Sequence, residues 1–402
     1  MKIIIIANFP ARIDGSKEKG RFLYLGEMLC ERGHDVTMLV SDFNHGTKKH
    51  RGSTEIKHEA YQTKIIALHE PGYPNNISIK RLWSHFVWGR NVGKFLNDTE
   101  KPDVIYCAVP SLTAAIKVAR YCKSAGPKFT IDVQDLWPEA FQMAVRNKLL
   151  QRALKPIDWY VNKIYRAADV VVAVSDTYVK RVLKVNAKVK DGYSIYLGND
   201  GALFDASRGE SIEERNNKEI KLAYIGTLGY SYDLKCVIDA IDISKPNEWP
   251  QIVKFVIMGD GPMKDELIRY AQLKRVECEF TGSLPYQEMV KKLCECDIVV
   301  NPIKSGSAAS IINKVGDYAL SGLPVINTQE SPEYRKLLEQ YKCGINCRVG
   351  NAQDVADAIV KLSKNPELRK QMGENARRLG EERFDRRQTY KQIVEVIEES
   401  NV

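Results

Sequence analysis

The N-terminal half of the chain alternates continuous apolar runs with segments of helical periodicity. Ile3–Ile6 is entirely apolar, which is typical of a strand buried on both faces of a sheet. A helix is predicted over Phe22–Arg32, ended by Gly33, and a second strand over Val36–Val40. This order predicts a parallel sheet with a right-handed crossover. Further strands are predicted over 103–107, 128–132, 169–174 and 194–197, and helices over 113–123 and up to residue 168.

The same alternation restarts in the C-terminal half. Asp205–Glu219 is rich in Ser, Gly, Asn and charged residues, and we interpret it as a linker between two domains. Two consecutive doubly wound α/β domains are therefore predicted, over residues 1–205 and 206–384, with ligands bound where the carboxyl ends of the strands face a cleft. Strands are predicted over 221–225, 254–258, 276–280, 297–301 and 323–327, and a helix over 233–241.

The composition is that of a globular protein. Of the 402 residues, 44% are hydrophobic and 28% charged, which allows a large core and excludes wholesale disorder. The apolar run at Ile3–Ala7 is too short for a signal sequence, and no run reaches the roughly 18 residues of a spanning helix. The nine cysteines lack zinc-ligand spacing, so we expect free thiols in a reducing cytoplasm.

The positive charge is concentrated in the first half. Residues 1–200 contain 31 Lys and Arg against 20 Asp and Glu, a balance of +11, whereas the remainder carries −2. This asymmetry predicts an acidic partner for one domain only: membrane lipid, a phosphorylated acceptor or nucleic acid. Sequence signatures of nucleic-acid-binding folds are absent, so nucleic acid is the least favoured of the three.

Two glycine-containing turns follow predicted strands of the second domain. They are Gly226-Thr227-Leu228-Gly229 and Gly259-Asp260-Gly261-Pro262. Glycine lets a phosphate approach the backbone, and the helix that follows offers unpaired N–H groups. The alternative is that both are ordinary strand–helix turns, because the dinucleotide-binding spacing of glycines is not present.

The segment Ser310–Ile326 predicts a short helix ended by Gly322 and then a buried strand. Lys314 and Asp317 are three residues apart and share a helix face. A lysine there can neutralise a diphosphate, and the carboxylate can accept hydrogen bonds from ribose hydroxyls. The alternative is a solvent-exposed ion pair that contributes little.

Two segments of the first domain carry candidate binding residues. Asp132–Glu139 places Asp135, Trp137 and Glu139 after a strand, where α/β sites form; the alternative is a capped loop beside a buried tryptophan. Residues 79–96 interleave aromatic and basic side chains, and Trp83 and Phe86 follow helical spacing. This helix either lies on an anionic lipid surface or turns its apolar stripe to the core. His85 within it is a candidate base.

Searches for metal and nucleophile motifs are negative. HExxH, DxD, GxSxG and clustered His/Cys spacings are missing, and so is the ATP-binding P-loop. We therefore expect no metal and no cofactor.

Taken together, the motifs resemble the retaining GT-B glycosyltransferases of glycosyltransferase family 4, especially bacterial enzymes of capsule, O-antigen or exopolysaccharide synthesis. The resemblance covers nearly the whole chain and rests on the order of the motifs. The motifs that carry the resemblance are residues 32–36, 135–139, 168–169, 198–201, 224–229, 259–262, 281–285, 319–325, 365–369 and 382–384.

The resemblance implies a GT-B fold whose last helix, about residues 385–402, returns to the N-terminal domain. It implies that the C-terminal domain holds a nucleotide sugar, for which UDP is expected, and that the N-terminal domain holds a saccharide or lipid-linked saccharide acceptor. The implied catalytic residues are Lys314 and Asp135. The implied donor-binding residues are Gly226, Thr227, Gly229, Gly259, Gly261, Gly282, Ser283, Leu284, Lys304, Lys314 and Asp317. The implied acceptor-binding residues are Asp135, Trp137, Glu139 and His85.

The sequence departs from the family at two positions. The family commonly carries Glu-x7-Glu, but Ala309 stands eight residues before Asp317, so the carboxylate that usually holds the donor sugar is missing. Thr227 stands where the family often has arginine, so Lys314 or Lys304 has to supply positive charge to the diphosphate.

The expected function is metal-independent transfer of a hexose from a nucleotide sugar with retention, in the cytoplasm or at the inner face of the cell membrane. Two alternatives stay open: a UDP-sugar 2-epimerase of the same fold, and a non-catalytic protein that binds nucleotide sugars or glycans.

Overall fold

The computed structural model describes residues 1–10, 13, 15, 18–51, 55–56, 59, 61–76, 78–109, 111–137, 139, 155–209, 219–244, 252–306 and 311–399. The chain forms two compact units. The first contains Met1–Ile195 and Tyr390–Val402, and the second contains Tyr196–Thr389.

The first unit is built on an eight-stranded sheet, with the strand order β10-β9-β8-β7-β1-β2-β6-β5. All neighbouring strands are parallel except β5 and β6, and a separate antiparallel hairpin consists of β3 and β4. The strands are β1 (Lys2–Ala7), β2 (Asp35–Ser41), β3 (Phe43–Asn44), β4 (Lys49–His50), β5 (Glu55–Ile56), β6 (Lys64–Leu68), β7 (Val104–Val109), β8 (Lys128–Val133), β9 (Val170–Ala173) and β10 (Tyr193–Ser194).

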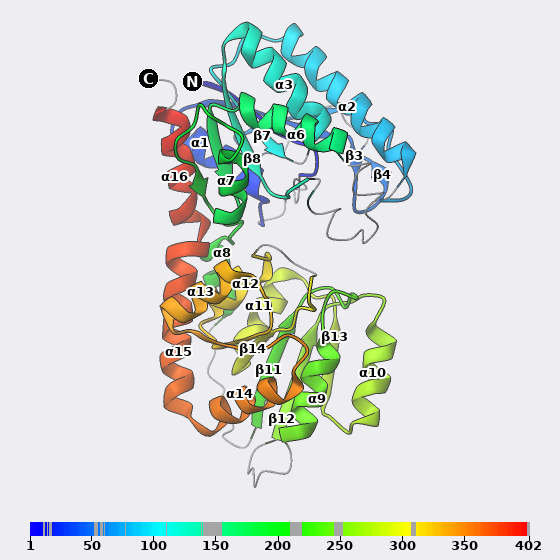
Figure 1. Ribbon diagram of the computed structural model, residues 1–402, viewed down its shortest axis with the longest axis vertical. Coiled ribbons are helices and arrows are strands. Elements are labelled where there is room, and N and C mark those ends of the chain that lie inside the picture. The colour runs from blue at the N-terminus through cyan, green and yellow to red at the C-terminus, as the bar shows by residue number, and fades with distance from the viewer. Residues whose placement is uncertain are drawn as a thin grey trace. The chain divides into compact units, whose positions relative to one another are not determined.

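Helices cover this sheet, and the last helix of the chain joins them. In Figure 1, α2 and α3 lie side by side; they approach so closely that a side chain on Gly89 would meet the backbone of Thr113. Tyr390, Ile393 and Ile397 pack into the apolar core beside β1 and β2. The helices are α1 (Arg21–Glu31), α2 (Ile79–Asp98), α3 (Leu112–Ala125), α6 (Lys155–Ala167), α7 (Asp176–Leu183) and, from Tyr390 on, α16 (Arg386–Glu399).

The second unit is built on a six-stranded, fully parallel sheet with the order β13-β12-β11-β14-β15-β16. Apolar residues fill both faces of this sheet, so helices are needed on both sides. The strands are β11 (Glu219–Ile225), β12 (Ile252–Met258), β13 (Cys278–Gly282), β14 (Ile298–Asn301), β15 (Val325–Asn327) and β16 (Gly344–Asn346).

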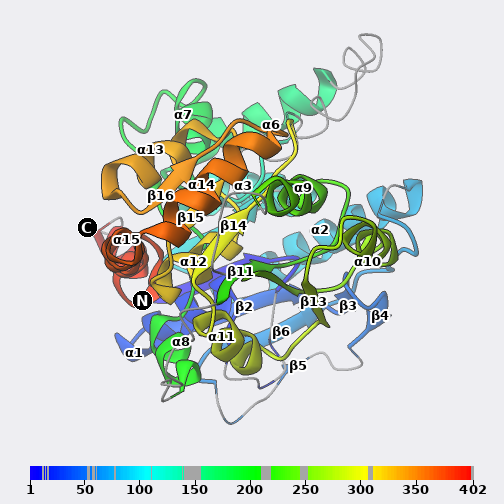
Figure 2. The ribbon, with the colours of Figure 1, turned by 90° about the horizontal axis from the view of Figure 1, so that it is seen from below.

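The helices of the second unit form two groups. The helices α9, α10 and α14 contribute to one core, while α11, α12, α13 and α15 contribute to the other; Figure 2 shows α9 and α11 on opposite sides of β11. The bounds are α8 (Gly201–Arg208), α9 (Leu234–Ser244), α10 (Lys264–Leu273), α11 (Tyr286–Cys294), α12 (Lys314–Ser321), α13 (Pro332–Tyr341), α14 (Ala352–Lys364), α15 (Pro366–Leu379) and a π-helical turn, Gly380–Phe384.

The predicted pair of doubly wound α/β domains is confirmed. One detail is wrong: Asp205–Arg208, which we assigned to the linker, lies in α8. This helix forms because Asp200 caps it, accepting hydrogen bonds from the N–H groups of Ala202 and Leu203 (both 3.1 Å). Residues 210–218 of the predicted linker lie outside the described residues.

A buried ion pair holds four elements of the first unit together. The Arg21 Nε donates to Asp132 Oδ2 (2.6 Å), and the Tyr106 hydroxyl donates to the same oxygen (2.8 Å). The Arg21 Nη1 donates to the Tyr390 hydroxyl (3.0 Å). Because the Arg21 and Asp132 side chains are only 4% and 0% exposed, removal of one partner leaves the other charge buried and unpaired.

We expect Arg21→Met to reduce the free energy of unfolding by about 3 kcal/mol, the usual cost of orphaning a buried charge. Arg32→Met is the matched control. The Arg32 guanidinium is half exposed and 3.8 Å from Glu398, so its loss should cost less than about 1 kcal/mol. Urea unfolding of both variants measures the difference, and equal losses would contradict the role given to Arg21.

Candidate functional site

The carboxyl ends of β11, β12 and β13 run into glycine-containing turns that lie side by side. The Gly226 N–H donates to the carbonyl of Met258, and the Leu228 N–H donates to the carbonyl of Asp260, both at 2.9 Å. The two turns that we predicted separately from the sequence therefore form one surface at the edge of the sheet.

The close approach of these turns explains their glycines. A β-carbon on Gly259 would lie 1.9 Å from the Gly226 carbonyl oxygen, and one on Gly261 would lie 2.6 Å from that of Leu228. Gly259 also bridges to Gly282, which has a positive φ of 74° at the end of β13. Packing alone is thus enough to require Gly259 and Gly261.

Gly226 has a φ of 131°, which favours glycine, and it also leaves room for a side chain from another element. A β-carbon there would lie 2.7 Å from Nζ of Lys314, the first residue of α12, so the absence of a side chain gives the lysine its place under the turn. The Lys314 Nζ lies 4.0 Å from the ring centre of Tyr224 and 3.9 Å from that of Tyr232. The Lys314 Nζ thus lies against the rings of Tyr224 and Tyr232, next to the Gly226 turn.

The Lys314 ammonium has no anionic counterpart in the part of the chain that the structure describes. Its Nζ is buried and has no hydrogen-bond partner among those residues, although the residue as a whole is partly exposed. Burial lowers the pKa of Lys314 well below its ordinary value of 10.5. An anion bound at the Gly226 turn would supply the missing partner.

Asp317, one helical turn further on, meets different neighbours. Its Oδ1 accepts hydrogen bonds from the Asn199 side-chain amide (2.7 Å) and the Tyr286 hydroxyl (2.9 Å). Gly316 makes room for this contact, since a β-carbon there would lie 2.1 Å from Asn199 Oδ1. Asp317 is buried, as is the Lys314 Nζ, so the alternative of a solvent-exposed ion pair is wrong.

The other predicted donor-binding residues lie around the same edge. Thr227 is exposed, and its carbonyl accepts a hydrogen bond from the Tyr224 hydroxyl (2.8 Å). Lys304 is exposed after β14, with its N–H bonded to the Ser231 carbonyl (3.0 Å). Gly229 and Leu284 are partly buried and Ser283 is exposed. Ala309 lies outside the described residues.

Three of the four predicted acceptor residues lie after β8. Asp135 is exposed, yet nearby protein atoms desolvate its carboxyl enough to raise its pKa. Trp137 is partly buried. Glu139 already has a partner, because the Arg181 guanidinium of α7 donates to its Oε1. The structure therefore leaves Asp135 more accessible to a ligand than Glu139.

His85 belongs to a cluster that the sequence did not reveal, which we call the aromatic–cation cluster. The Arg81 Nε donates to His85 Nε2 (3.4 Å), and the His45 imidazole is hydrogen-bonded to the Tyr73 hydroxyl (2.6 Å). The cluster consists of Phe9, His45, Lys48, Tyr73, Arg81 and His85.

Electrostatics in this cluster disfavour further positive charge. Burial and the neighbouring Arg81 lower the pKa of His85 to about 4, so this imidazole is neutral at physiological pH. Burial, Lys48 and Arg81 also lower the pKa of His45. The interleaved basic and aromatic residues after position 79 indicated a binding surface. The sequence could not reveal the whole cluster, because Phe9, His45, Lys48 and Tyr73 are distant from α2 along the chain.

The apolar stripe of α2 faces solvent. Trp83 and Phe86 are 60% and 50% exposed and stack on each other with ring centres 5.7 Å apart, and Ile79 and Leu82 are also exposed. The expectation that this stripe packs on the core is therefore wrong; Trp88, Val92 and Leu96 on the opposite face do so. Towards the end of α2, a groove of about 510 Å³ is lined by Arg90, Lys94, Lys117 and Arg120 among others.

Each half of the chain matches a known protein family. Residues 21–196 match the family described as Glycosyltransferase Family 4, and residues 208–379 match the one described as Glycosyl transferases group 1. Both halves of the chain are therefore glycosyltransferase domains. An uncharacterized glycosyltransferase of Methanocaldococcus jannaschii is 22% identical over 237 residues, which cover 58% of this chain and 59% of that protein.

Solved structures show that the fold of these glycosyltransferase domains is GT-B. Sucrose-phosphate synthase from Thermosynechococcus elongatus superposes with a TM-score of 0.72 at 16% identity, covering 99% of this chain and 98% of the other. Anabaena HepE in complex with UDP gives 0.69 at 16% identity, covering 99% and 100%. No described helix is both long and apolar enough to cross a membrane.

Lys314→Met should leave the ligand-free protein at least as stable as the wild type at neutral pH, because it removes a buried amine that has no anionic partner in the described part of the chain. The folded protein lowers the pKa of Lys314. Between that lowered pKa and 10.5, the Lys314 side chain is therefore more protonated in the unfolded chain than in the folded protein. Wild-type stability should therefore rise with pH in that window, and the variant should lack this rise.

Lys235→Met is the matched control, because Lys235 pairs with Glu266 on the surface. Urea unfolding at several pH values gives the comparison. A loss of several kcal/mol in Lys314→Met at neutral pH would show that the cation is needed for folding and would contradict this interpretation.

Proposed function

We propose that this protein transfers a hexose from a nucleotide sugar, with UDP as the nucleotide, to a saccharide or lipid-linked saccharide acceptor. The observation that carries the proposal is the buried Lys314 Nζ beside the Gly226 turn, which has no hydrogen-bond partner among the described residues. The solved complex of the structurally similar Anabaena HepE with UDP supports UDP as the nucleotide. The pathway proposed is synthesis of bacterial cell-surface polysaccharide, at the cytoplasmic side.

The chemistry proposed is stabilisation of a leaving group. The bond between the anomeric carbon and the diphosphate oxygen breaks, and its electron pair stays on the diphosphate. Lys314 and the N–H groups of the adjacent turns offset this growing negative charge, without a metal ion. The acceptor hydroxyl attacks from the same face and gives its proton to a phosphate oxygen, so the configuration is retained.

The remaining donor contacts follow from position. The base is proposed to lie against Gly282–Leu284, and the diphosphate against Gly226–Gly229 and Gly259–Gly261. The ribose is proposed to bind Asp317, whose Oδ1 it would share with Asn199 and Tyr286. Lys304, exposed at the same edge, is the second candidate for the diphosphate. Because Ala309 replaces the family's first carboxylate, other groups must hold the donor sugar.

The acceptor is proposed to bind the first unit through Asp135, Trp137, Glu139 and His85. Asp135, whose pKa is raised by desolvation, is the proposed catalytic group that orients the attacking hydroxyl. The neutral imidazole of His85 suits a hydrogen bond to a sugar hydroxyl. Arg81 and Lys48 beside it favour an acceptor that carries a phosphate.

A thermal-shift panel of UDP-, GDP-, ADP- and CMP-sugars, followed by transfer assays with the stabilising donor, tests the proposal. We expect Lys314→Ala to reduce kcat by about 100- to 1,000-fold with the fold intact, as for loss of a donor to a developing oxyanion. Lys304→Ala is the control and should lose less than about 10-fold, because the exposed Lys304 is screened by water.

Each other outcome contradicts a part of the proposal. Wild-type turnover in Lys314→Ala would remove the lysine from the mechanism. Conversion of the donor alone into its 2-epimer would identify an epimerase, and tight UDP binding without turnover of any donor would identify a binding protein.

We also propose that α2 lies on an anionic membrane surface. The exposed stripe of Ile79, Leu82, Trp83 and Phe86 suits the apolar side of a lipid interface, and the basic groove at the other end of α2 suits phosphate headgroups. The net charge of +11 over residues 1–200 also favours a negatively charged surface.

Co-sedimentation at low salt tests this contact. Wild-type protein should bind phosphatidylserine-containing vesicles and not vesicles of phosphatidylcholine alone, and the double substitution Trp83→Ser, Phe86→Ser should abolish binding. Leu273→Ser, which changes an even more exposed apolar residue on α10, should bind like the wild type. Equal binding of the double variant and the wild type would contradict the proposal.

A further inference from the structure

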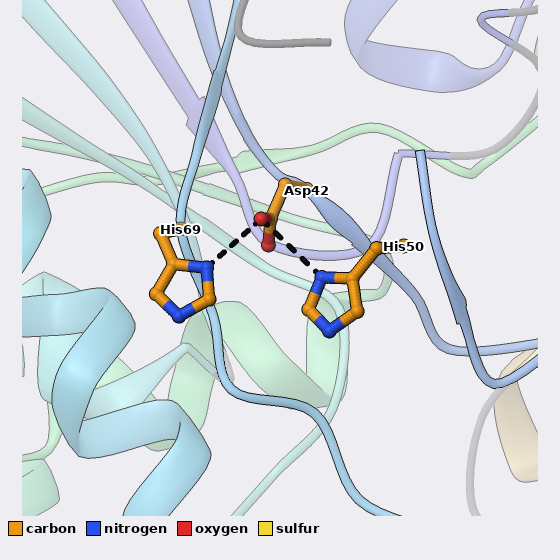
Figure 3. Close-up of side chains that lie close together, drawn as sticks. All are labelled: Asp42, His50 and His69. Carbon is orange, nitrogen blue, oxygen red and sulfur yellow. Dashed lines mark hydrogen bonds and ion pairs between the residues drawn. The ribbon is translucent and has the colours of Figure 1, made fainter. Parts of the chain in front are cut away.

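Three potential metal ligands meet at one edge of the first unit. None of them is a proposed donor-binding or acceptor-binding residue. Asp42 directly follows β2, His50 ends β4, and His69 directly follows β6. Figure 3 shows both imidazole rings turned towards the same carboxylate. Because these residues come from three separate segments, the sequence spacing gave no sign of the cluster.

The geometry places three different ligand atoms around one point. The Nδ1 atoms of His69 and His50 lie 3.0 Å and 3.3 Å from Asp42 Oδ2, and all three atoms lie within 4.8 Å of one another. Neighbouring ligands of a tetrahedral ion with bonds of about 2.0–2.1 Å are themselves roughly 3.3 Å apart. Small rotations of the rings would therefore complete such a site.

The backbone holds the carboxylate in place. Asp42 Oδ1 accepts a hydrogen bond from the Glu70 N–H (2.7 Å), which leaves Oδ2 directed at the two rings. The Asp42 N–H donates to the Leu68 carbonyl (2.9 Å), and the Asp42 carbonyl accepts from the Arg51 N–H (2.7 Å). The three ligand-bearing segments are thus tied together, and the carboxylate has the supporting hydrogen bond that metal ligands usually have.

We propose that Asp42, His50 and His69 bind one Zn²⁺ ion. Two imidazole nitrogens and one carboxylate oxygen are ligands that Zn²⁺ accepts, whereas Mg²⁺ and Ca²⁺ require oxygen ligands. The His50 and His69 side chains are 45% and 62% exposed, so water can reach the fourth position. Simple hydrogen bonding between the imidazoles and the carboxylate is the alternative, and it requires no metal.

The ion would fasten the β3–β4 hairpin to the ends of β2 and β6. This hairpin carries His45 and Lys48 of the aromatic–cation cluster, so the metal stabilises the loop that presents them. The inference concerns stability of the first unit and does not depend on the nucleotide chemistry of Lys314. Its failure and the failure of the proposed transferase activity are therefore distinguishable.

The test is calorimetric titration of Zn²⁺ into the full-length protein after treatment with a chelator. We expect one equivalent to bind and to raise the melting temperature. Co²⁺ in place of Zn²⁺ should give the visible absorption of a tetrahedral nitrogen–oxygen site. His50→Gln and His69→Gln should each weaken Zn²⁺ binding by more than about 10-fold, and Asp42→Asn should do the same.

His45→Gln is the matched control, because His45 lies in the turn of the same hairpin but hydrogen-bonds Tyr73 instead of Asp42. It should bind Zn²⁺ like the wild type. Two results would overturn the proposal: no stoichiometric binding by the wild type, or undiminished binding by both exposed histidine variants, which would place the ion at other groups such as the cysteines. The two histidine variants keep the test valid if Asp42→Asn does not fold.

Discussion

The chemistry of the second unit depends on a buried lysine side chain that has no anionic partner among the residues that the structure describes. Lys314 Nζ is buried between the rings of Tyr224 and Tyr232, and the aromatic faces only partly replace the hydration that the ammonium loses. Such a group costs stability in the free protein. It becomes favourable when an anion binds beside it, so the same residue weakens the fold and prepares the site.

The glycines around this lysine are explained by two separate constraints. Gly259 and Gly261 allow neighbouring turns to touch, whereas Gly226 makes room for the lysine itself. The second constraint cannot be seen in the sequence, because Gly226 and Lys314 are far apart along the chain. A glycine-rich motif therefore indicates that the backbone closely approaches another group. Only the structure shows whether that group is a neighbouring turn or a side chain.

Much of the fold could be predicted because it follows from local pattern. Continuous apolar runs of β-branched residues such as Ile3–Ile6 favour strands of a sheet covered on both faces, and β1 is buried accordingly. The outward orientation of Trp83 and Phe86 could not be predicted, since the same spacing suits a core-facing stripe. Which face is buried depends on α3, against which α2 packs through Gly89. Similarly, the sequence could not show that Glu139 accepts a hydrogen bond from Arg181, because Arg181 lies on a later helix.

The most direct measurement is a crystal structure of the protein with UDP. The account predicts that the diphosphate lies over the Gly226 turn, with a phosphate oxygen about 2.7–2.9 Å from Lys314 Nζ, the length of a charge-assisted hydrogen bond. A diphosphate bound elsewhere, or a Lys314 Nζ that stays between the two tyrosine rings with no phosphate contact, would contradict it.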